Sequence, residues 1–561
     1  MHGVLGIDFG TTNTLCAWMD GETPIIVPNQ RGERATASVV AISDAGELLV
    51  GTSARNHAQA YPDSALFGVK RLLGKPMQTG LIDGFISPEA AATAILSRVR
   101  RDAEAYLGFE VDRAVISVPA RFSDAQRRAI REAASKAGLR AERIINEPSA
   151  AALARAWMSV RDELEQLVLV YDFGGGTFDA SVLKVQGGSC SVLSSEGDDT
   201  LGGMDIDAAI YRDVVERFIT EFGIDTDSDP LLSRMLLDLC EKAKIELSSR
   251  EEVVIAVPFL RGSGGLVHPQ LHFDRARFER IAAPFIERSL ALVDKVLSSA
   301  SRKAHDIDIL VLSGGSSRIP MARRLLKAAI GREADPRINP EEIVALGAAI
   351  EAARLEGRLK GLSFSDVCSR TFGLEIDEGG FIPLIAKNQV LPATGRRMFT
   401  TVEDYQHSVE LHVLQSEGTR AADGISVGRF LLTGVRKARK GEPKIAVEFT
   451  IDEGDMLLVS ARDMDTGVEQ SIALFDGVVD SRCPQDRVIA LAQMARREAQ
   501  GLNLDAALSA ELSDALVDAT RCDGDDERAL KTASILEGLL SELLARARQA
   551  EDKTLSVGSG G

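Results

Sequence analysis

The sequence has little cysteine and no long apolar run. Six cysteines occur among 561 residues, at positions 16, 190, 240, 368, 483 and 522. None forms a CxxC or another close pair, which argues against a disulfide framework and a zinc site and favours reduced thiols in a cytosolic protein. No apolar stretch approaches the ~20 residues that a membrane helix needs. The start "MHGVLGIDFG" shows no basic start or apolar core of a secretory signal. We therefore expect a cytoplasmic protein with no membrane contact.

Basic residues are fewer than acidic ones. The chain has 65 Lys and Arg against 83 Asp and Glu, a net charge of −18. A nucleic-acid partner is not expected, because phosphate backbones bind basic surfaces. A nucleotide remains compatible with an acidic chain, since backbone N–H groups and a metal can hold its phosphates. The sequence lacks a Walker A motif and the loops of a protein kinase, so neither of these nucleotide folds is predicted.

The length and the patterns that are present suggest three or four structural units. Short β-rich runs alternate with long amphipathic helices up to about residue 360, which predicts α/β architecture. Short strands with period-2 alternation follow, in "SVELHVLQ" (408–415) and "KIAVEFTID" (444–452), and predict an antiparallel β-domain. The sequence becomes helical from about residue 484, with an apolar stripe that includes Leu536 and Leu539.

One device occurs twice in the α/β part. "DFGTTNT" covers 8–14 and "DFGGGTFD" covers 172–179. In each, an Asp at a strand end is followed by Gly and Thr, which can offer N–H and hydroxyl donors to a phosphate, while Asp can hold Mg²⁺ or position a water. Two such hairpins could grip one triphosphate from both sides and would mark two related halves. The alternative is that each is an ordinary hairpin turn.

A third glycine turn, "VLSGGSSRIP" (311–320), follows a strand and opens a helix. Together the three turns resemble the superfamily of actin, sugar kinases and heat-shock ATPases. Further stretches occur in the order and spacing of the 70-kilodalton heat-shock protein family: "LFGVKRLLG", "AVISVPARFSDAQRRA", "RIINEPSAAALA", "LGGMDID", "CEKAKIELSS", "NPEEIVALGAAIEAA", "HVLQSEGTRAAD" and "FTIDEGDMLLVSARD". The resemblance covers about residues 3–475. The sequence is similar to that of a short, divergent DnaK-type chaperone of the HscC-like branch.

This resemblance implies a domain order. It consists of an actin-like two-lobed ATPase domain (1–358), a linker (359–367), a β-sandwich peptide-binding domain (368–480), a truncated helical lid (481–552) and a flexible tail (553–561). The implied function is an ATP-dependent chaperone that binds extended apolar peptides and couples ATP hydrolysis to peptide affinity. Its implied partners are unfolded peptides, a J-domain co-chaperone and a nucleotide-exchange factor. The implied cofactors are ATP or ADP with Mg²⁺, and K⁺ stays open as a second cation.

The resemblance also transfers roles in ATP hydrolysis to residues of this sequence. The catalytic residues it implies are Lys70, which would position the attacking water, with Asp8, Glu147, Asp172, Thr177 and Asp179. Asp8 and Asp172 would hold the metal through water. The nucleotide would be held by Gly10, Thr11, Thr12, Asn13, Gly174, Gly175, Gly176, Thr177, Gly202, Gly203, Glu241, Lys244, Ser248, Gly314, Gly315, Ser316 and Arg318.

Further positions match coupling and peptide sites of the family. Coupling between nucleotide site and linker would use Pro119, Arg127 and Asp366, and Arg143, Asn146 and Asp366 would contact a J-domain. The peptide cleft would include Leu374, Asp377, Phe399, Val402, Val409, Leu411 and Ile445. Apart from the resemblance, such apolar residues are typical of a sandwich core. By this resemblance Asp377 stands at the arch over the peptide, where a carboxylate predicts an arch that is open or closed by a charge pair with the peptide, and a preference for peptides carrying Lys or Arg. The alternative is a slip of one or two residues in the alignment, which would leave Asp377 facing solvent.

The sequence departs from the family pattern in several places. Met204 replaces a Glu, Arg121 replaces a Tyr, and Ser363 and Ser365 replace linker leucines, so linker docking should bury less apolar surface. Two rival functions stay open. One is a sugar kinase or actin-like ATPase, which the β-domain after residue 367 disfavours. The other is a non-hydrolysing exchange or regulatory partner of another chaperone, which the catalytic set around Lys70 disfavours.

Overall fold

The computed structural model describes residues 3–74, 86–160, 164–226, 229–262, 265–359, 361–376, 379–406, 408–452, 457–475, 478–480, 506–519 and the single residues 532, 535, 536 and 539. The chain divides into two compact units, Met1–Ser369 and Arg370–Gly561, each described by itself below. In the part of the chain that the structure describes, no helix is long and apolar enough to cross a membrane. The four cysteines in that part are buried and form no disulfide.

The first unit contains two sheets of matching topology. One has the order β3-β2-β1-β8-β9 and consists of β1 (Val4–Phe9), β2 (Asn13–Asp20), β3 (Thr23–Val27), β8 (Arg113–Val118) and β9 (Arg140–Asn146), with β4 (Thr36–Ala37) also paired to β2. The other has the order β17-β10-β11-β12-β18 and consists of β10 (Gln166–Phe173), β11 (Phe178–Gln186), β12 (Ser189–Asp198), β17 (Ile309–Ser313) and β18 (Ser363–Ser365).

The doubled sequence motif occupies the same place in both sheets. Strand β1 pairs antiparallel with β2 and parallel with β8, just as β10 pairs antiparallel with β11 and parallel with β17. Each "DFG" segment forms the hairpin between the two antiparallel strands. The arrangement agrees with the two related halves that the repeated motif predicts.

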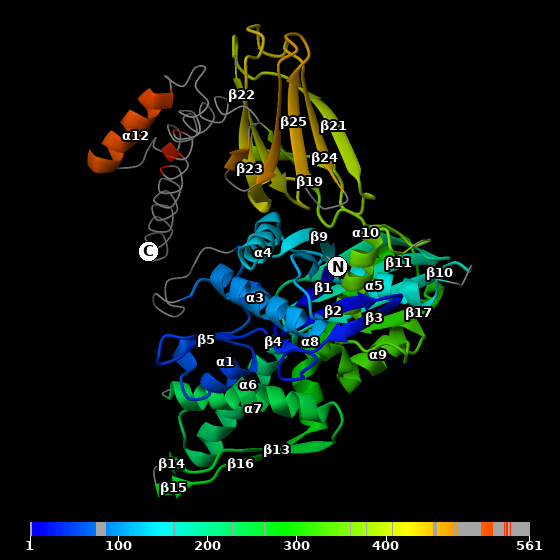
Figure 1. Ribbon diagram of the computed structural model, residues 1–561, viewed down its shortest axis with the longest axis vertical. Coiled ribbons are helices and arrows are strands. Elements are labelled where there is room, and N and C mark those ends of the chain that lie inside the picture. Colours follow the sequence, from blue (N-terminus) through cyan, green and yellow to red (C-terminus); the bar gives the residue numbers. More distant parts are fainter. Residues whose placement is uncertain are drawn as a thin grey trace. The chain divides into compact units, whose positions relative to one another are not determined.

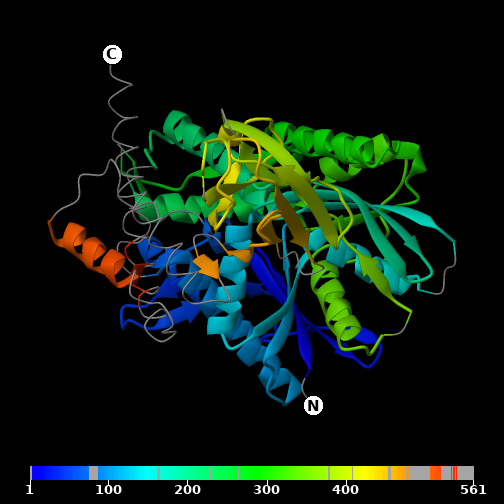
Figure 2. The same cartoon turned by 90° about the horizontal axis from the view of Figure 1, so that it is seen from above.

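Helices cover these sheets (Figures 1 and 2). They are α1 (Thr52–His57), α2 (Val69–Leu72), α3 (Pro88–Leu107), α4 (Asp124–Lys136), α5 (Glu147–Met158), α6 (Gly203–Phe222), α7 (Pro230–Leu247), α8 (Arg275–Ser299), α9 (Pro320–Ile330) and α10 (Ile343–Leu355). Their starts follow local chemistry: Ser87 accepts a hydrogen bond from Ala90 N, and Ser123 forms a capping box with Gln126. Smaller sheets pair β5 (Val40–Ile42) with β6 (Leu48–Val50) and β7 (Ala65–Leu66), β13 (Glu252–Ala256) with β16 (Gln270–Asp274), and β14 (Leu260–Gly262) with β15 (Gly265–Val267).

Helices α5 and α10 pack between the two sheets. One buried cluster joins their apolar side chains to Val4 and Val115 of the first sheet and to Val168 of the second. The close approach needs Gly347, because a Cβ there would lie 1.8 Å from the carbonyl oxygen of Ala150. Two further clusters fill the outer faces of the sheets, beneath α3 and α4 on one side and α6, α7 and α8 on the other. These layers fix the strand ends that carry the doubled motif.

The second unit is an antiparallel sandwich, as the period-2 alternation predicts. One sheet has the order β20-β19-β22-β23 and consists of β19 (Phe372–Ile376), β20 (Gly380–Ile385), β22 (Ser408–Gln415) and β23 (Ile425–Thr433). The other has the order β21-β24-β25-β26-β27 and consists of β21 (Ala393–Phe399), β24 (Ile445–Ile451), β25 (Leu457–Asp463), β26 (Glu469–Phe475) and β27 (Val478–Asp480). Of the predicted lid, the structure describes α12 (Ala506–Ala519) and four helical residues between 532 and 539. The remaining lid and the predicted tail lie outside the described residues.

Candidate nucleotide site

The two motif hairpins face each other at close range. A Cβ on Gly175 would lie 2.2 Å from Thr12 Oγ1, and a Cβ on Gly176 would lie 2.4 Å from Thr11 Oγ1. Only glycine fits at either position without displacing the opposite hairpin. The structure therefore places the donors of both hairpins around one narrow space, as the duplicated motif predicts.

A cavity of about 450 Å³ opens between the hairpins, a size that suits a small-molecule ligand. It is lined by eighteen of the predicted residues: Asp8, Gly10, Thr11, Thr12, Asn13, Lys70, Glu147, Asp172, Gly174, Gly175, Thr177, Glu241, Lys244, Ser248, Gly314, Gly315, Ser316 and Arg318. Four predicted residues do not line it: Gly176, Asp179, Gly202 and Gly203.

Buried carboxylates gather at the closed end of the cavity. Burial raises the pKa of Asp8 to about 7, and Glu147 adds to the rise. The pKa of Asp172 lies well above its usual range, because of burial first and then Glu147 and Asp8. Burial raises the pKa of Asp179 as well, followed by Glu147 and Asp172. Such a concentration of acids with shifted pKa values is typical of a functional site.

Lys70 is the cation within this acidic cluster. Its side chain is only 2% exposed and forms an ion pair with Glu147. The α2 helix that carries it starts after Gly68, whose φ of 62° turns the chain inward. Lys70 is therefore not a solvated surface charge, which is the usual position of a lysine. Lys70 thus lies among the carboxylates of four residues, namely Asp8, Glu147, Asp172 and Asp179.

The acidic cluster fits the cation that the sequence predicts here. Asp8 accepts a hydrogen bond from Ser117 Oγ at 2.9 Å, whereas Asp179 Oδ1 has no hydrogen-bond partner among the described residues. Carboxylate oxygens are the ligands that Mg²⁺ prefers. Within the described residues, no group of three or more His, Cys, Asp or Glu is arranged to hold a metal ion. The prediction for Asp8 and Asp172 is of a different kind, with contact through water.

The opposite end of the cavity suits a flat base. Arg318 lies in the short turn Gly315–Arg318, where its Nε donates to Glu341 at 2.8 Å and its Nη2 donates to Asn339 at 2.9 Å. These two bonds hold the guanidinium plane at the rim, a geometry suited to stacking. On α7, Glu241 is ion-paired with Arg55, a contact between residues 186 apart that sequence patterns do not reveal.

Gly202 and Gly203 pack against the second hairpin and do not line the cavity. Gly203 N donates to Gly174 O at 3.0 Å, and a Cβ on Gly202 would meet the backbone of Gly175 and Gly176 at 2.6 Å. The sequence prediction that both approach the phosphates is thus not matched by the cavity lining. Their role is to let the start of α6 press against the hairpin from behind.

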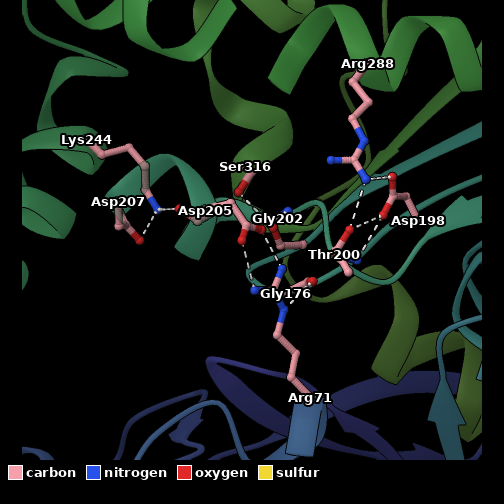
Figure 3. Close-up of polar contacts among 12 residues, drawn as sticks. Arg71, Gly176, Asp198, Thr200, Gly202, Asp205, Asp207, Lys244, Arg288 and Ser316 are labelled. Atoms are coloured by element: carbon pink, nitrogen blue, oxygen red, sulfur yellow. Dashed lines mark hydrogen bonds and ion pairs between the residues drawn. The ribbon is translucent and has the colours of Figure 1, made fainter. Parts of the chain in front are cut away.

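Arg71 is a site residue that the sequence reasoning missed, although it follows Lys70 directly. Its Nε donates to Gly176 O at 2.7 Å, and its other nitrogens bond both carboxylate oxygens of Asp205 (Figure 3). Asp205 follows Met204, the position where the family pattern has Glu. The neighbouring Asp therefore supplies the carboxylate that clamps the two halves together. Lys244 bonds Asp207 at 2.8 Å in the same region.

Arg121, the second departure from the family pattern, also has an acidic partner. One of its guanidinium nitrogens lies 3.8 Å from a carboxylate oxygen of the buried Glu196. Its positive charge opposes the rise in the pKa of Asp179. The replacement of Tyr by Arg thus places an additional cation near the acidic cluster.

A buried polar chain links the first sheet to the predicted linker. Arg127 Nη2 donates to Asn146 Oδ1 at 2.7 Å, and Asn146 Nδ2 donates to Asp366 Oδ2 at 3.2 Å. Ser149 Oγ donates to the same carboxylate at 2.9 Å. Asp366 is 7% exposed, so this acid of the predicted linker is buried. The predicted coupling residue Pro119, which precedes Arg127 in the sequence, is also buried.

The predicted linker is not a free segment in this structure. Its residues 363–365 form β18, which pairs parallel with β12 at the edge of the second sheet. Phe364 packs against the buried core, and the guanidinium of Arg143 lies 5.3 Å from the centre of its ring. Arg143 is itself 6% exposed and ion-paired with Glu351 at 2.7 Å. The linker is thus held by the apolar packing of Phe364 and by the hydrogen bonds of Asp366.

The predicted peptide residues divide into two groups. Leu374, Leu411 and Ile445 are buried in the second unit, as ordinary sandwich core residues would be. Val402 is 51% exposed, and Phe399 and Val409 are partly buried. Asp377 lies outside the described residues. Among the described members of the predicted set, Val402 in the turn after β21 is thus the most exposed.

Comparison with known proteins decides the family. A family model described as Hsp70 protein matches residues 4–87 and 77–528. The chain belongs to the Hsp70 protein family. It is 41% identical over 477 residues to a protein named chaperone protein DnaK from Thermosipho melanesiensis. The matched region covers 84% of this chain and 80% of that protein. The DnaK-type, 70-kilodalton heat-shock resemblance is thereby confirmed.

Family membership also establishes the general activity. The protein is an ATP-dependent Hsp70 chaperone and an ATPase. The prediction of an enzyme is confirmed, and both rival functions fall away. The assignment to an HscC-like branch stays a prediction.

Proposed function

We propose that this Hsp70 protein hydrolyses ATP in the cavity between its two motif hairpins. Asp8 and Asp172 would hold Mg²⁺ through water, and the backbone and hydroxyl donors around Thr11, Thr12 and Thr177 would take the phosphates. When bound, Mg²⁺ would offset the negative charge of the phosphates. The buried Lys70–Glu147 ion pair among three further carboxylates carries the proposal.

The chemistry at this site is positioning and charge stabilisation, as in other phosphoryl transfers. Lys70 orients the attacking water and balances the phosphate charge. Glu147 holds Lys70 in place through their buried ion pair. Thr177, next to the second hairpin, and Asp179 complete the proposed catalytic set.

The second unit is proposed to bind extended apolar peptides, at the turn that presents Val402. Coupling would run through the Arg127–Asn146–Asp366 chain, because nucleotide-dependent movement of β9 or α4 changes the partners of Asp366. We further propose a J-domain co-chaperone, an exchange factor, a cytoplasmic location and K⁺ as a second cation. These are extended from the family.

Single-turnover ATP hydrolysis, measured with and without an apolar peptide, tests the proposal. We expect slow hydrolysis that the peptide accelerates in the wild type. Hydrolysis unaffected by any peptide would contradict the coupled function, and hydrolysis unaffected by loss of Lys70 would contradict the proposed site.

A further inference from the structure

The second unit carries a run of basic residues in a protein of net charge −18. The segment between β23 and β24 reads "GVRKARKGEPK" (434–444) and contains five Lys or Arg against one Glu. Four of these cations fall within residues 436–440, which we call the basic loop. All four are exposed.

Three of these cations form no ion pair in the part of the chain that the structure describes. Arg436 lies 3.6 Å from Glu442 and 3.4 Å from Asp465, measured between guanidinium nitrogens and carboxylate oxygens. Among the described residues, no ion pair involves Lys437, Arg439 or Lys440. Their positive charge is therefore available to an outside partner.

The basic loop is attached to the turn that follows β21, residues 401–406. Tyr405 N donates to Ala438 O at 2.7 Å, and Gly441 N donates to Thr401 O at 3.1 Å. Lys440 N donates to a carboxylate oxygen of Asp404 at 2.9 Å. Three hydrogen bonds thus hold the cations beside the turn, and one of them engages the nearest carboxylate.

The turn presents apolar side chains on a fixed backbone. Gln406 Oε1 accepts hydrogen bonds from Val402 N at 3.1 Å and Glu403 N at 3.3 Å, and Gln406 Nε2 donates to Ser408 O at 2.8 Å. Val402 is 51% exposed and Tyr405 is 64% exposed, with a φ of 60° at Tyr405. A side chain held outward by a left-handed backbone indicates a contact surface. Val402 is also the residue that the sequence assigns to the peptide cleft.

We infer that the peptide bound by this unit carries Asp or Glu beside its apolar core, and that Lys437, Arg439 and Lys440 select it. The inference rests on the proposed peptide-binding function. The apolar core would contact Val402 and Tyr405, and the acidic flank would meet the basic loop. This is the opposite of the preference for basic peptides that the sequence suggests from Asp377, which lies outside the described residues. The basic loop offers three cations that form no ion pair in the described part of the chain, against Glu403 and Asp404 in the turn.

Peptide binding to the full chain in ADP, measured by fluorescence anisotropy, tests the inference. Three peptides share one apolar core and differ in flanks of Glu, Ser or Lys. We expect affinity to fall in that order, with about tenfold between the Glu and Lys peptides, which is what a few exposed charge contacts provide. The difference should shrink as salt is added. An equal or reversed order would overturn the inference.

A variant and its matched control locate the effect. Lys437→Gln/Arg439→Gln/Lys440→Gln should remove the preference and leave affinity for the Ser-flanked peptide unchanged. The control removes the same charge from exposed positions of the first unit, namely Arg101→Gln/Lys136→Gln/Arg302→Gln. The control should keep the preference. If both variants lose it equally, the effect belongs to net charge and not to the basic loop.

Two outcomes separate this inference from the proposed function. If the Ser-flanked peptide does not bind at all, peptide binding itself fails. If it binds and stimulates hydrolysis but charge makes no difference, only the present inference fails. The chain's own "DGDDE" segment (523–527) is a rival occupant. Acidic preference that appears only in Asp523→Asn/Asp525→Asn/Asp526→Asn would assign the basic loop to that segment instead.

Discussion

Asn146 donates a hydrogen bond from its side-chain amide to a carboxylate oxygen of Asp366, across 3.2 Å and 220 residues of sequence. Asn146 ends β9, and Asp366 follows β18. The other end of the same amide accepts from Arg127 of α4. Because one amide holds both partners, the position of α4 and the docking of the linker depend on each other.

Asp366→Asn should weaken coupling between ATP hydrolysis and peptide binding while both units stay folded. The substitution turns one acceptor oxygen into a donor that faces the amide of Asn146 and the hydroxyl of Ser149. A lost buried hydrogen bond of this kind costs about 1–3 kcal/mol. We expect basal hydrolysis to persist and peptide stimulation to fall several-fold. Asp294→Asn, on the exposed side of α8, is the matched control. Full stimulation in Asp366→Asn would remove the linker assignment.

Lys70→Ala should slow hydrolysis by about 100-fold or more, because it removes the buried lysine that is ion-paired with Glu147 in the acidic cluster. ATP binding should change little, since most phosphate contacts come from the backbone donors of the hairpins. Single-turnover hydrolysis and equilibrium ATP binding measure the two effects. Lys242→Ala on the exposed face of α7 should leave both unchanged. Near-normal turnover without Lys70 would refute its role.

Asp8→Asn should stabilise the nucleotide-free protein, and the gain should grow with pH. The folded pKa of Asp8 is raised from 3.8 to about 7. The folded state therefore loses stability as pH rises through this interval, when the buried carboxyl must ionise. The difference in unfolding free energy between Asp8→Asn and wild type should rise between pH 4 and about pH 7, reaching on the order of 3 kcal/mol. Denaturant unfolding at several pH values measures it, and a difference that does not vary with pH would contradict the assignment.

Arg71→Ala should speed ADP release by about tenfold. The substitution removes a charged bond to Asp205 and a bond to Gly176 O, and charged hydrogen bonds contribute about 1.5–3 kcal/mol each. Stopped-flow release of a fluorescent ADP analogue measures the rate. Arg101→Ala, an exposed arginine of α3, serves as control. An unchanged release rate would show that Arg71 does not hold the halves together.

The sequence predicted the parts of the site that depend on local chemistry. Asp8 and Asp172 end strands, and the Gly-Thr turns beside them bring donors to the same edge of each sheet. The repetition of that device was enough to predict two halves around one cavity. The antiparallel second unit followed from apolar residues at every second position, as at Val409 and Leu411, which places them on one face of a strand.

Contacts between distant residues could not be predicted in this way. The Arg55–Glu241 pair and the clamp from Arg71 to Asp205 depend on how the halves close, which no local pattern encodes. Asp366 lies in the segment predicted to be the linker, and the pairing of β18 with β12 and the burial of this carboxylate were not predictable from the sequence. Gly202 and Gly203 follow the turn pattern of phosphate-binding glycines, but their backbones pack behind the hairpin.

The pairing of β18 with β12 has a consequence for the molecule when the linker detaches. Strand β12 would then become the edge of its sheet, with a row of N–H and C=O groups open to any passing extended chain. A strongly apolar linker would make such an edge more prone to self-association. Ser363 and Ser365 keep the returning strand polar on alternate positions, so the second sheet can be uncovered repeatedly with less risk of aggregation.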